Sequence, residues 1–322
     1  MVMRGWPLIK LLPHKTNFRF VRYAPGAGIV SLILCVASIV ACFYPGLEMG
    51  IDFRGGAVME MSAPAGKSVE VAKVREAMNN LNLGEVQVQN IDGDQKAIVR
   101  FQMPEYEEQG AVVARVQNAI TEAAGEVNYS GVSVVGSKVS SELLVSGLLA
   151  LGAAFVLMFA YIWFRFEPQF GFGAIAGLVH DVILTFGLIV LFKLEFSLNM
   201  VAAILTVIGY SMNDTVVVFD RLRENLRKYK TMPLRDVIDL SLNETLSRTI
   251  ITGVTAVGVL AVLAIFGGEA LFGFSIALMF GIVIGTYSSI YVGTPIIMLW
   301  GVKRGALDED NKPVKFGMAS RP

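Results

Sequence analysis

Six long apolar runs dominate this sequence and restrict what it can fold into. A helix that crosses the hydrocarbon core of a bilayer needs roughly 20 mostly apolar residues. Charged residues make up only 17% of the chain, against about 25% in an average soluble domain. We therefore expect an integral membrane protein with six spanning helices, over Gly26–Phe43, Leu143–Phe164, Phe170–Phe192, Phe196–Phe219, Thr249–Phe266 and Phe272–Trp300.

The basic residues orient these helices. Residues 1–25 carry five basic and no acidic side chains, and residues 221–235 carry six basic and one acidic. Because loops rich in lysine and arginine stay on the cytoplasmic side of a membrane, both termini are expected on that side. The formal net charge of zero is a sum of segregated basic and acidic segments, so it gives no reason to expect a nucleic-acid partner.

Five segments follow from this orientation. We expect a cytoplasmic tail (1–25), a first transmembrane helix (26–45), an extracytoplasmic domain (46–140), transmembrane helices two to six (141–300) and a cytoplasmic tail (301–322). Residues 221–247, within the fourth segment, are expected to be cytoplasmic and amphipathic. Because Leu234, Val237, Ile238 and Leu242 recur at helical spacing after Pro233, this stretch predicts a helix lying on the membrane surface.

The segment between the first two spans predicts a small α+β domain. Strand patterns cover Ala57–Ser62, Val86–Ile91, Ala97–Phe101 and Val127–Val135, and Asp92-Gly93-Asp94 marks a turn between the second and third. Helical patterns cover Ser68–Leu81, with Ser68 as its N-cap, and Glu107–Ala124. The order βαββαβ is that of a ferredoxin-like fold.

Asp214 and Arg248 are the first candidates for function, because ionisable groups inside spanning helices are costly and mark function. Asn213-Asp214 lies in the fourth run and Arg248 opens the fifth. The two runs are antiparallel and joined on one side, so Asp214 and Arg248 are expected to meet at similar depth. Burial disfavours the charged carboxylate and a nearby arginine favours it, which suits a group that loads and releases a proton. Thr252, one turn deeper than Arg248, is positioned to relay that proton through water.

His180-Asp181, near the middle of the third run, is a second intramembrane pair. A proton path and a static hydrogen bond between helices are equally compatible with it. The Asp214–Arg248 pair likewise has an alternative role as a structural clamp between two helices. The pairs Gly173/Gly177 and Gly281/Gly285 are typical of close helix packing.

The sequence contains no recognisable catalytic constellation, metal-ligand cluster or phosphate-binding glycine loop. The glycine-rich stretch Gly50–Gly56 precedes a strand, whereas a phosphate cradle precedes a helix. We therefore expect no enzyme activity, no metal and no cofactor, with protons as the coupling ion.

Two motifs carry a family resemblance. Gly50-Ile51-Asp52-Phe53-Arg54-Gly55-Gly56 follows the first span, and Gly209-Tyr210-Ser211-Met212-Asn213-Asp214 begins a motif that continues to Asn225. With Leu246-Ser247-Arg248-Thr249 and Phe266-Gly267-Gly268, they resemble the SecF family of bacterial protein-export subunits, in the resistance–nodulation–division superfamily. The resemblance covers essentially the whole chain, and the second motif is long and specific.

The resemblance implies a function and partners. It implies a six-helix bundle that pairs with SecD as a heterodimer, acts beside the SecYEG translocon and YajC, and uses the proton motive force to assist a translocating unfolded polypeptide. The resemblance also implies that the bundle lies in the bacterial cytoplasmic (inner) membrane, surrounded by membrane lipid. The essential aspartate of the family corresponds to Asp214, its arginine to Arg248 and its threonine to Thr252. The alternatives are a small-molecule/proton antiporter of the same superfamily and a passive translocon scaffold.

Overall fold

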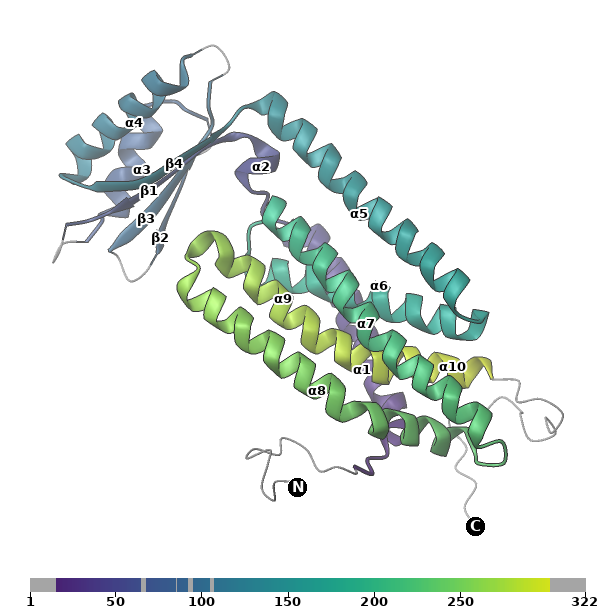
Figure 1. Ribbon diagram of the computed structural model, residues 1–322. Coiled ribbons are helices and arrows are strands. Elements are labelled where there is room, and N and C mark those ends of the chain that lie inside the picture. Colours follow the sequence, from purple (N-terminus) through teal and green to yellow (C-terminus); the bar gives the residue numbers. More distant parts are fainter. Residues whose placement is uncertain (1–15, 65–67, 85, 92–94, 105–106, 302–322) are drawn as a thin grey trace, which may run out of the picture. The chain divides into compact units, whose positions relative to one another are not determined.

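The computed structural model describes residues 16–64, 68–84, 86–91, 95–104 and 107–301, which form two compact units (Figure 1). One unit is a helix bundle built from the chain up to Glu48 and from Leu151 onward. The other, Met49–Ala150, contains a β-sheet. Residues 1–15 of the expected N-terminal tail, residues 302–322 of the C-terminal tail and the predicted Asp92–Asp94 turn lie outside the described residues.

Six spans in the described residues are long and apolar enough to cross a membrane, as the sequence predicts. The first is α1 with the π-helical turn η1 after it, and the sixth is divided into α9, the π-helical turn η2 and α10. Their bounds are α1 Phe20–Ala41, η1 Cys42–Gly46, α5 Ser137–Arg165, α6 Pro168–Leu191, α7 Leu198–Lys228, α8 Leu234–Phe266, α9 Glu269–Ser288, η2 Ser289–Gly293 and α10 Thr294–Trp300.

The prediction of a separate amphipathic helix on the membrane surface is wrong. Residues from Leu234 onward form the first part of α8, which continues without a break into the fifth span. Val237, Ile238 and Leu242 are buried in one apolar cluster with Phe219 and Leu222 of α7. Their apolar face is therefore covered by the extended end of α7, which runs well past the apolar run, and not by lipid.

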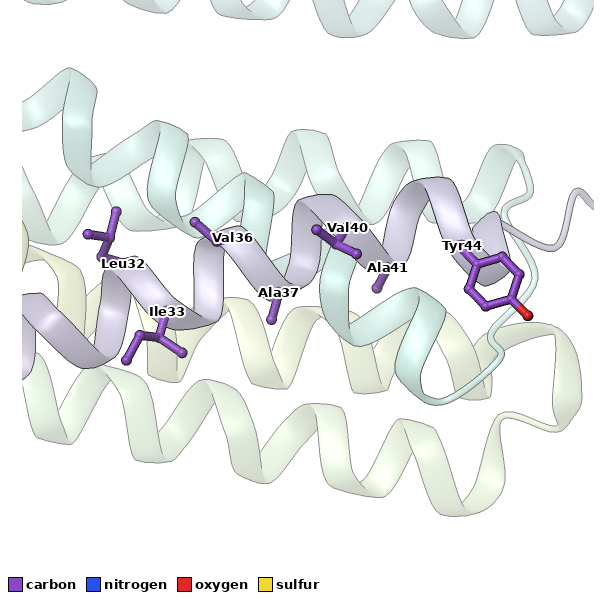
Figure 2. A pocket seen from close by; sticks show the side chains of 7 residues that line it. All are labelled: Leu32, Ile33, Val36, Ala37, Val40, Ala41 and Tyr44. Carbon is purple, nitrogen blue, oxygen red and sulfur yellow. The ribbon is translucent and has the colours of Figure 1, made fainter.

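Three helices form the interior of the bundle and three lie around it. α6, α7 and α9 carry most of its buried side chains, whereas α1, α5 and α8 leave rows of apolar side chains exposed. Figure 2 shows seven side chains of α1 and the turn after it, which line an open apolar hollow of about 610 Å³. Such exposed apolar faces suit contact with lipid hydrocarbon.

The sheet unit has the predicted βαββαβ order. It contains α2 Ile51–Arg54, β1 Gly56–Ser62, α3 Val71–Asn80, β2 Gln87–Ile91, β3 Lys96–Phe101, α4 Gln109–Ala124 and β4 Asn128–Val135. The strands lie in the order β2-β3-β1-β4, and each neighbouring pair is antiparallel. This is the ferredoxin-like arrangement, in which α3 connects β1 to β2 and α4 connects β3 to β4.

Apolar side chains at alternate strand positions form the core of the sheet unit. Met59, Met61 and Val99 of the sheet pack in one cluster with Val74 of α3 and Val116 of α4. All five are at most 1% exposed. The alternation along β1 and the helical spacing in α3 and α4 thus converge on a single interior.

The predicted start of the first helix of this unit is wrong. α3 begins at Val71, after Glu70, and no side chain caps it, so Ser68 is not the N-cap. The amide of Val71 bonds instead to the carbonyl of Val69, and the Val69 side chain is buried in the core.

Candidate functional site

Asp214 lies near the middle of α7, in the interior of the bundle. Its side chain is 3% exposed, although carboxylates are almost never fully buried unless paired. Thr286 of α9 donates a hydrogen bond to its Oδ2 atom over 3.1 Å. The sequence placed Asp214 close to the end of its helix, but α7 continues to Lys228, so the carboxyl group is several turns from that end.

Arg248 is at the predicted depth but does not form the expected direct ion pair. Asp214 precedes the end of α7 by as many residues as Arg248 follows the start of α8, so the two are level on packed antiparallel helices. Among the described residues, no ion pair within 4.0 Å joins them. The Arg248 side chain is exposed, whereas Asp214 is buried.

Among the described residues, no hydrogen bond joins Thr252 to Asp214. Its hydroxyl donates to the carbonyls of Arg248 and Thr249 in its own helix, over 2.9 and 3.0 Å. Tyr210, one turn before Asp214 on α7, has a buried hydroxyl group with no hydrogen-bond partner among the described residues. Tyr210 therefore presents an unpaired hydroxyl on the same side of α7 as the Asp214 carboxyl group.

Asp181 is the most completely buried carboxyl group in the described part of the bundle, at 0% exposure. Its Oδ1 atom lies 2.9 Å from Nδ1 of His180. Its Oδ2 atom accepts hydrogen bonds from Ser211 of α7, at 2.5 Å, and from Ser288 of α9, at 2.7 Å. A carboxylate with three donors of this kind is well satisfied, and these bonds connect α6 with α7 and α9.

The two carboxyl groups share their supporting helices. Ser211 and Asp214 are three residues apart on α7, and Thr286 and Ser288 are two apart on α9. Each helix thus supplies a group to both sites. We infer one polar layer across α6, α7 and α9, which contains both buried carboxyl groups.

Close approach of α7 and α9 depends on glycine. A Cβ atom at Gly285 would lie 3.0 Å from both Cα and Cβ of Ser211, and one at Gly281 would overlap the side chain of Val207. At Gly173 of α6, a Cβ atom would lie 2.6 Å from the carbonyl oxygen of Gly293. The sequence interpretation of these glycines as packing residues is confirmed at these three positions.

Asn213 points away from this layer. It is exposed and lines a crevice between α5 and α7, opposite Leu157 and Tyr161. Its neighbour in sequence, Asp214, faces the bundle interior, since consecutive residues on a helix do not share a face. The structure therefore separates Asn213 from the Asp214 carboxyl group.

The motif after the first span forms a turn whose backbone conformation requires glycine. Gly50 precedes the single turn α2, and Phe53 of that turn is buried. Gly55 and Gly56 have φ values of 74° and 118°, and a Cβ atom at Gly56 would lie 2.5 Å from the carbonyl oxygen of Phe101. Only glycine combines the positive φ with the absence of a Cβ atom that position 56 requires. The turn leads directly into β1. Asp52, also in this motif, is half-buried and belongs to the same turn.

Four polar residues of the site escape sequence analysis: Tyr210, Ser211, Thr286 and Ser288. Uncharged hydroxyl side chains are common in spanning helices, so their presence alone is not informative. Tyr210 and Ser211 do carry a signal, because they precede Asp214 by four and three residues and so share its side of the helix.

Comparisons with known proteins place these residues in a family context. The family model described as protein export membrane protein SecD/SecF, C-terminal, matches residues 115–303. Protein translocase subunit SecF of Cereibacter sphaeroides is 45% identical over 312 residues, covering 94% of this chain and 96% of that protein. Protein translocase subunit SecF of Rhodobacter capsulatus is 43% identical, with 94% of each covered.

Two solved structures of SecDF proteins resemble this chain in fold. The crystal structure of a Thermus SecDF, a translocon-associated membrane protein, superposes with a TM-score of 0.79 at 30% identity over 90% of this chain. A second SecDF structure, in a super-membrane-facing form, gives 0.62 at 28% identity over 91%. The chain spans about 40% of the length of the first SecDF and 39% of the second.

Proposed function

The chain belongs to the SecF family of protein translocase subunits, and on that premise we propose that it couples proton movement through its helix bundle to the export of polypeptides. It is a multi-pass membrane protein and an accessory subunit of the Sec translocase. The coupling ion, the residues that bind it and the direction of transport are the content of the proposal.

The observation that supports this proposal most directly is the burial of Asp214. The carboxyl group is 3% exposed, and among the described residues its hydrogen bond comes from the uncharged hydroxyl of Thr286. Removing a carboxylate from water costs several kcal/mol unless a cation compensates. A proton neutralises the same group, so the helix packing around Asp214 depends on its protonation.

Arg248 and Tyr210 give the carboxyl group an alternative partner. Arg248 is level with Asp214 on the adjacent helix, outside direct pairing distance, and Tyr210 lies one helical turn before Asp214 on α7 with its buried hydroxyl unpaired. We propose that ionised Asp214 is stabilised by approach of Arg248, and that protonated Asp214 returns to the hydroxyl of Thr286. Thr252 then lies at the proton's entry route beside Tyr210.

Asp181 takes the structural role in this scheme. Two hydroxyl donors and His180 already satisfy it, so it has less reason than Asp214 to change its charge. Of the two roles open to His180-Asp181, the hydrogen bonds to α7 and α9 favour the static one. The pair would then fix the level at which those helices cross α6.

The chain connects the bundle to the sheet unit at two points, through which helix movement can be transmitted. α1 leads through the Gly50–Gly56 turn into β1, and β4 is followed directly by α5. A shift of either helix therefore pulls on a strand of the same sheet. We propose that the sheet unit lies outside the cytoplasmic membrane, with both termini in the cytoplasm, and holds an emerging unfolded polypeptide.

The proposed partners rest on family membership. We propose SecD as the other half of a heterodimer, with SecYEG as the channel and YajC as a further associate. In support, the SecDF chains that superpose on this protein are more than twice its length, which leaves room there for a second bundle.

An Asp214→Asn variant tests the proposal, with Asp236→Asn as its control. Asparagine keeps the size of the side chain and can still accept the Thr286 hydrogen bond, but it cannot ionise. Asp236 is an exposed carboxylate at the start of α8. Both variants replace the native chain in cells, and export of a secreted precursor is measured with and without a proton motive force.

We expect Asp214→Asn to assemble normally and to lose proton-dependent export, while Asp236→Asn keeps it. Full export by Asp214→Asn would refute proton coupling at this residue and leave a passive scaffold. Normal export with impaired expulsion of a small molecule would favour an antiporter instead. Loss of assembly would be visible as reduced abundance of the complex on native gels, and Asp214→Glu, which retains an ionisable group, would then have to restore export.

A further inference from the structure

A basic pocket lies where α5 ends beside the last third of α7. It has a volume of about 510 Å³ and is lined by Arg165, Asp220, Arg223, Glu224, Arg227 and Lys228. Four cations thus face two carboxylates. The excess of positive charge suits an anionic ligand.

Each carboxylate of the pocket already pairs with an arginine, one inside the pocket and one outside it. Asp220 accepts two hydrogen bonds from Arg165, at 2.9 and 2.6 Å. Glu224 pairs with Arg221, which lies outside the pocket, at 2.6 Å. These charge-assisted bonds leave little capacity to neutralise the remaining cations.

Three cations of the pocket lack a close anion. The nearest carboxylates to Arg223 are Glu167 at 3.7 Å and Asp220 at 3.9 Å, both beyond hydrogen-bond distance, and its buried Nε atom has no partner. Among the described residues, no carboxylate lies within 4.0 Å of Arg227 or Lys228. Arg223 in particular is a half-buried guanidinium with unused donors.

Aromatic residues place this pocket at the level of the lipid headgroups. Trp163 and Phe164, 57% and 89% exposed, immediately precede Arg165 at the end of the α5 span. Phe172 near the start of α6 stacks on Trp300 at the end of α10, with ring centroids 4.8 Å apart. Tryptophan and other aromatic rings gather where hydrocarbon meets the polar headgroups.

An apolar crevice begins one helical turn deeper in the membrane span than the pocket. It lies between the same two helices, has a volume of about 540 Å³ and is lined mainly by apolar side chains, among them Ala154 and Leu157 of α5. It reaches Tyr161 and Val216, which are one helical turn deeper than Arg165 and Asp220 of the pocket. Head and tail of one amphiphile would fit these two adjoining spaces.

We propose that this pocket binds the phosphate group of an anionic phospholipid, with one acyl chain in the crevice between α5 and α7. Arg223 and Arg227 provide the charge-assisted hydrogen bonds to phosphate oxygens, and Lys228 adds a point charge. The bound lipid would fill the space between α5 and α7 and hold the end of α5 at the headgroup layer.

The test uses the full chain, purified in neutral detergent and offered equal amounts of phosphatidylglycerol and phosphatidylcholine. Native mass spectrometry counts the lipids retained. The test variant is Arg223→Gln with Arg227→Gln, and the matched control is Lys230→Gln with Arg235→Gln, two exposed cations outside the pocket. Each basic residue lost should weaken binding of the anionic lipid by roughly fivefold, so we expect on the order of a 30-fold loss in the test variant.

The control must retain phosphatidylglycerol as the unaltered chain does. Equal loss in both double variants would mean diffuse surface charge and would overturn the site. Equal retention of the two lipids would overturn the preference for an anionic head. If the first variant does not give a single size-exclusion peak, Arg227→Gln with Lys228→Gln, which changes only exposed cations, carries the same expectation.

The crevice has its own test. Ala154→Trp fills it, whereas Ala153→Trp adds the same ring to an exposed neighbouring position. We expect the first to reduce lipid retention and the second to leave it unchanged. Inorganic phosphate at about 10 mM would compete even with a Kd on the order of 1 mM. It therefore distinguishes a lipid headgroup from free phosphate as the ligand of the pocket. If it displaces all bound lipid, and Ala154→Trp has no effect, the pocket is a free-phosphate site and the lipid proposal fails.

Discussion

Replacing Gly285 by alanine should separate two helices that the site holds together. The added Cβ atom would lie 3.0 Å from both Cα and Cβ of Ser211 and 3.3 Å from its Oγ atom. Part of that clash is with the backbone of α7, so no change of rotamer relieves it. α9 must move away from α7, and the hydrogen bond from Ser211 to Asp181 moves with it.

The size of the effect follows from two opposing contributions. Overpacking of a close interface costs about 1–3 kcal/mol, and alanine gains about 1 kcal/mol over glycine in a helix. Gly258→Ala in α8 is the matched control, because a Cβ atom there meets nothing within 4 Å and only the gain remains. The difference between the two variants therefore isolates the overpacking cost.

The assay is thermal unfolding of the full chain in detergent, followed by the loss of the monodisperse size-exclusion peak. At about 2–4 °C per kcal/mol for a unit of this size, Gly285→Ala should melt roughly 2–12 °C below Gly258→Ala. Gly281→Ala adds a second comparison, because its clash is with the side chain of Val207 and Val207→Ala should rescue it. Equal melting of Gly285→Ala and Gly258→Ala would refute the close-approach argument.

Three further outcomes are expected from the same structure. Ser288→Ala removes one of the donors to buried Asp181 and should cost about 1.5–3 kcal/mol in the melting assay; no loss would mean that water replaces the hydroxyl. Phe219→Ala empties a position that is 0% exposed and packed against Phe166 and Phe170, and should cost about 3–5 kcal/mol by the same measurement. In the sheet unit, burial raises the pKa of Tyr129, with the Thr121 hydroxyl opposing the shift. The folded state therefore favours the neutral phenol, and this stabilisation is complete below about pH 10 and is lost as the pH rises further. Tyr129→Phe should lower the stability of the sheet unit by about 0.5–1.5 kcal/mol at neutral pH, because the hydrogen bond to the Gln117 carbonyl is lost. The variant should also lose less stability than the unaltered chain as the pH rises above about 10, measured as protease sensitivity against pH. An unchanged alkaline profile would contradict this account.

Much of the architecture follows from local patterns. Apolar runs of sufficient length predicted the six spans, and the alternation of strand and helix patterns predicted βαββαβ. These features depend on near neighbours in the chain, which is why one sequence suffices for them. Asp214 was likewise identifiable, because a carboxyl group inside an apolar run is conspicuous without any knowledge of its surroundings.

Helix ends were harder to predict where packing overrides composition. The charged residues after Phe219 end the apolar run but not the helix, since the end of α7 covers Val237, Ile238 and Leu242 of α8. A pattern of apolar residues shows that a face must be buried. It does not say whether lipid or another helix buries it.

The sequence by itself determined which groups carry charge inside the membrane and on which helices they lie. Only the tertiary structure decided their partners: Asp214 accepts from Thr286 while Arg248 stays exposed, and Asp181 collects Ser211 and Ser288 from two other helices. The physical reason is that partnership depends on the rotation of each helix about its axis and on how closely glycine lets neighbours approach. Both are set by the packing of the whole bundle.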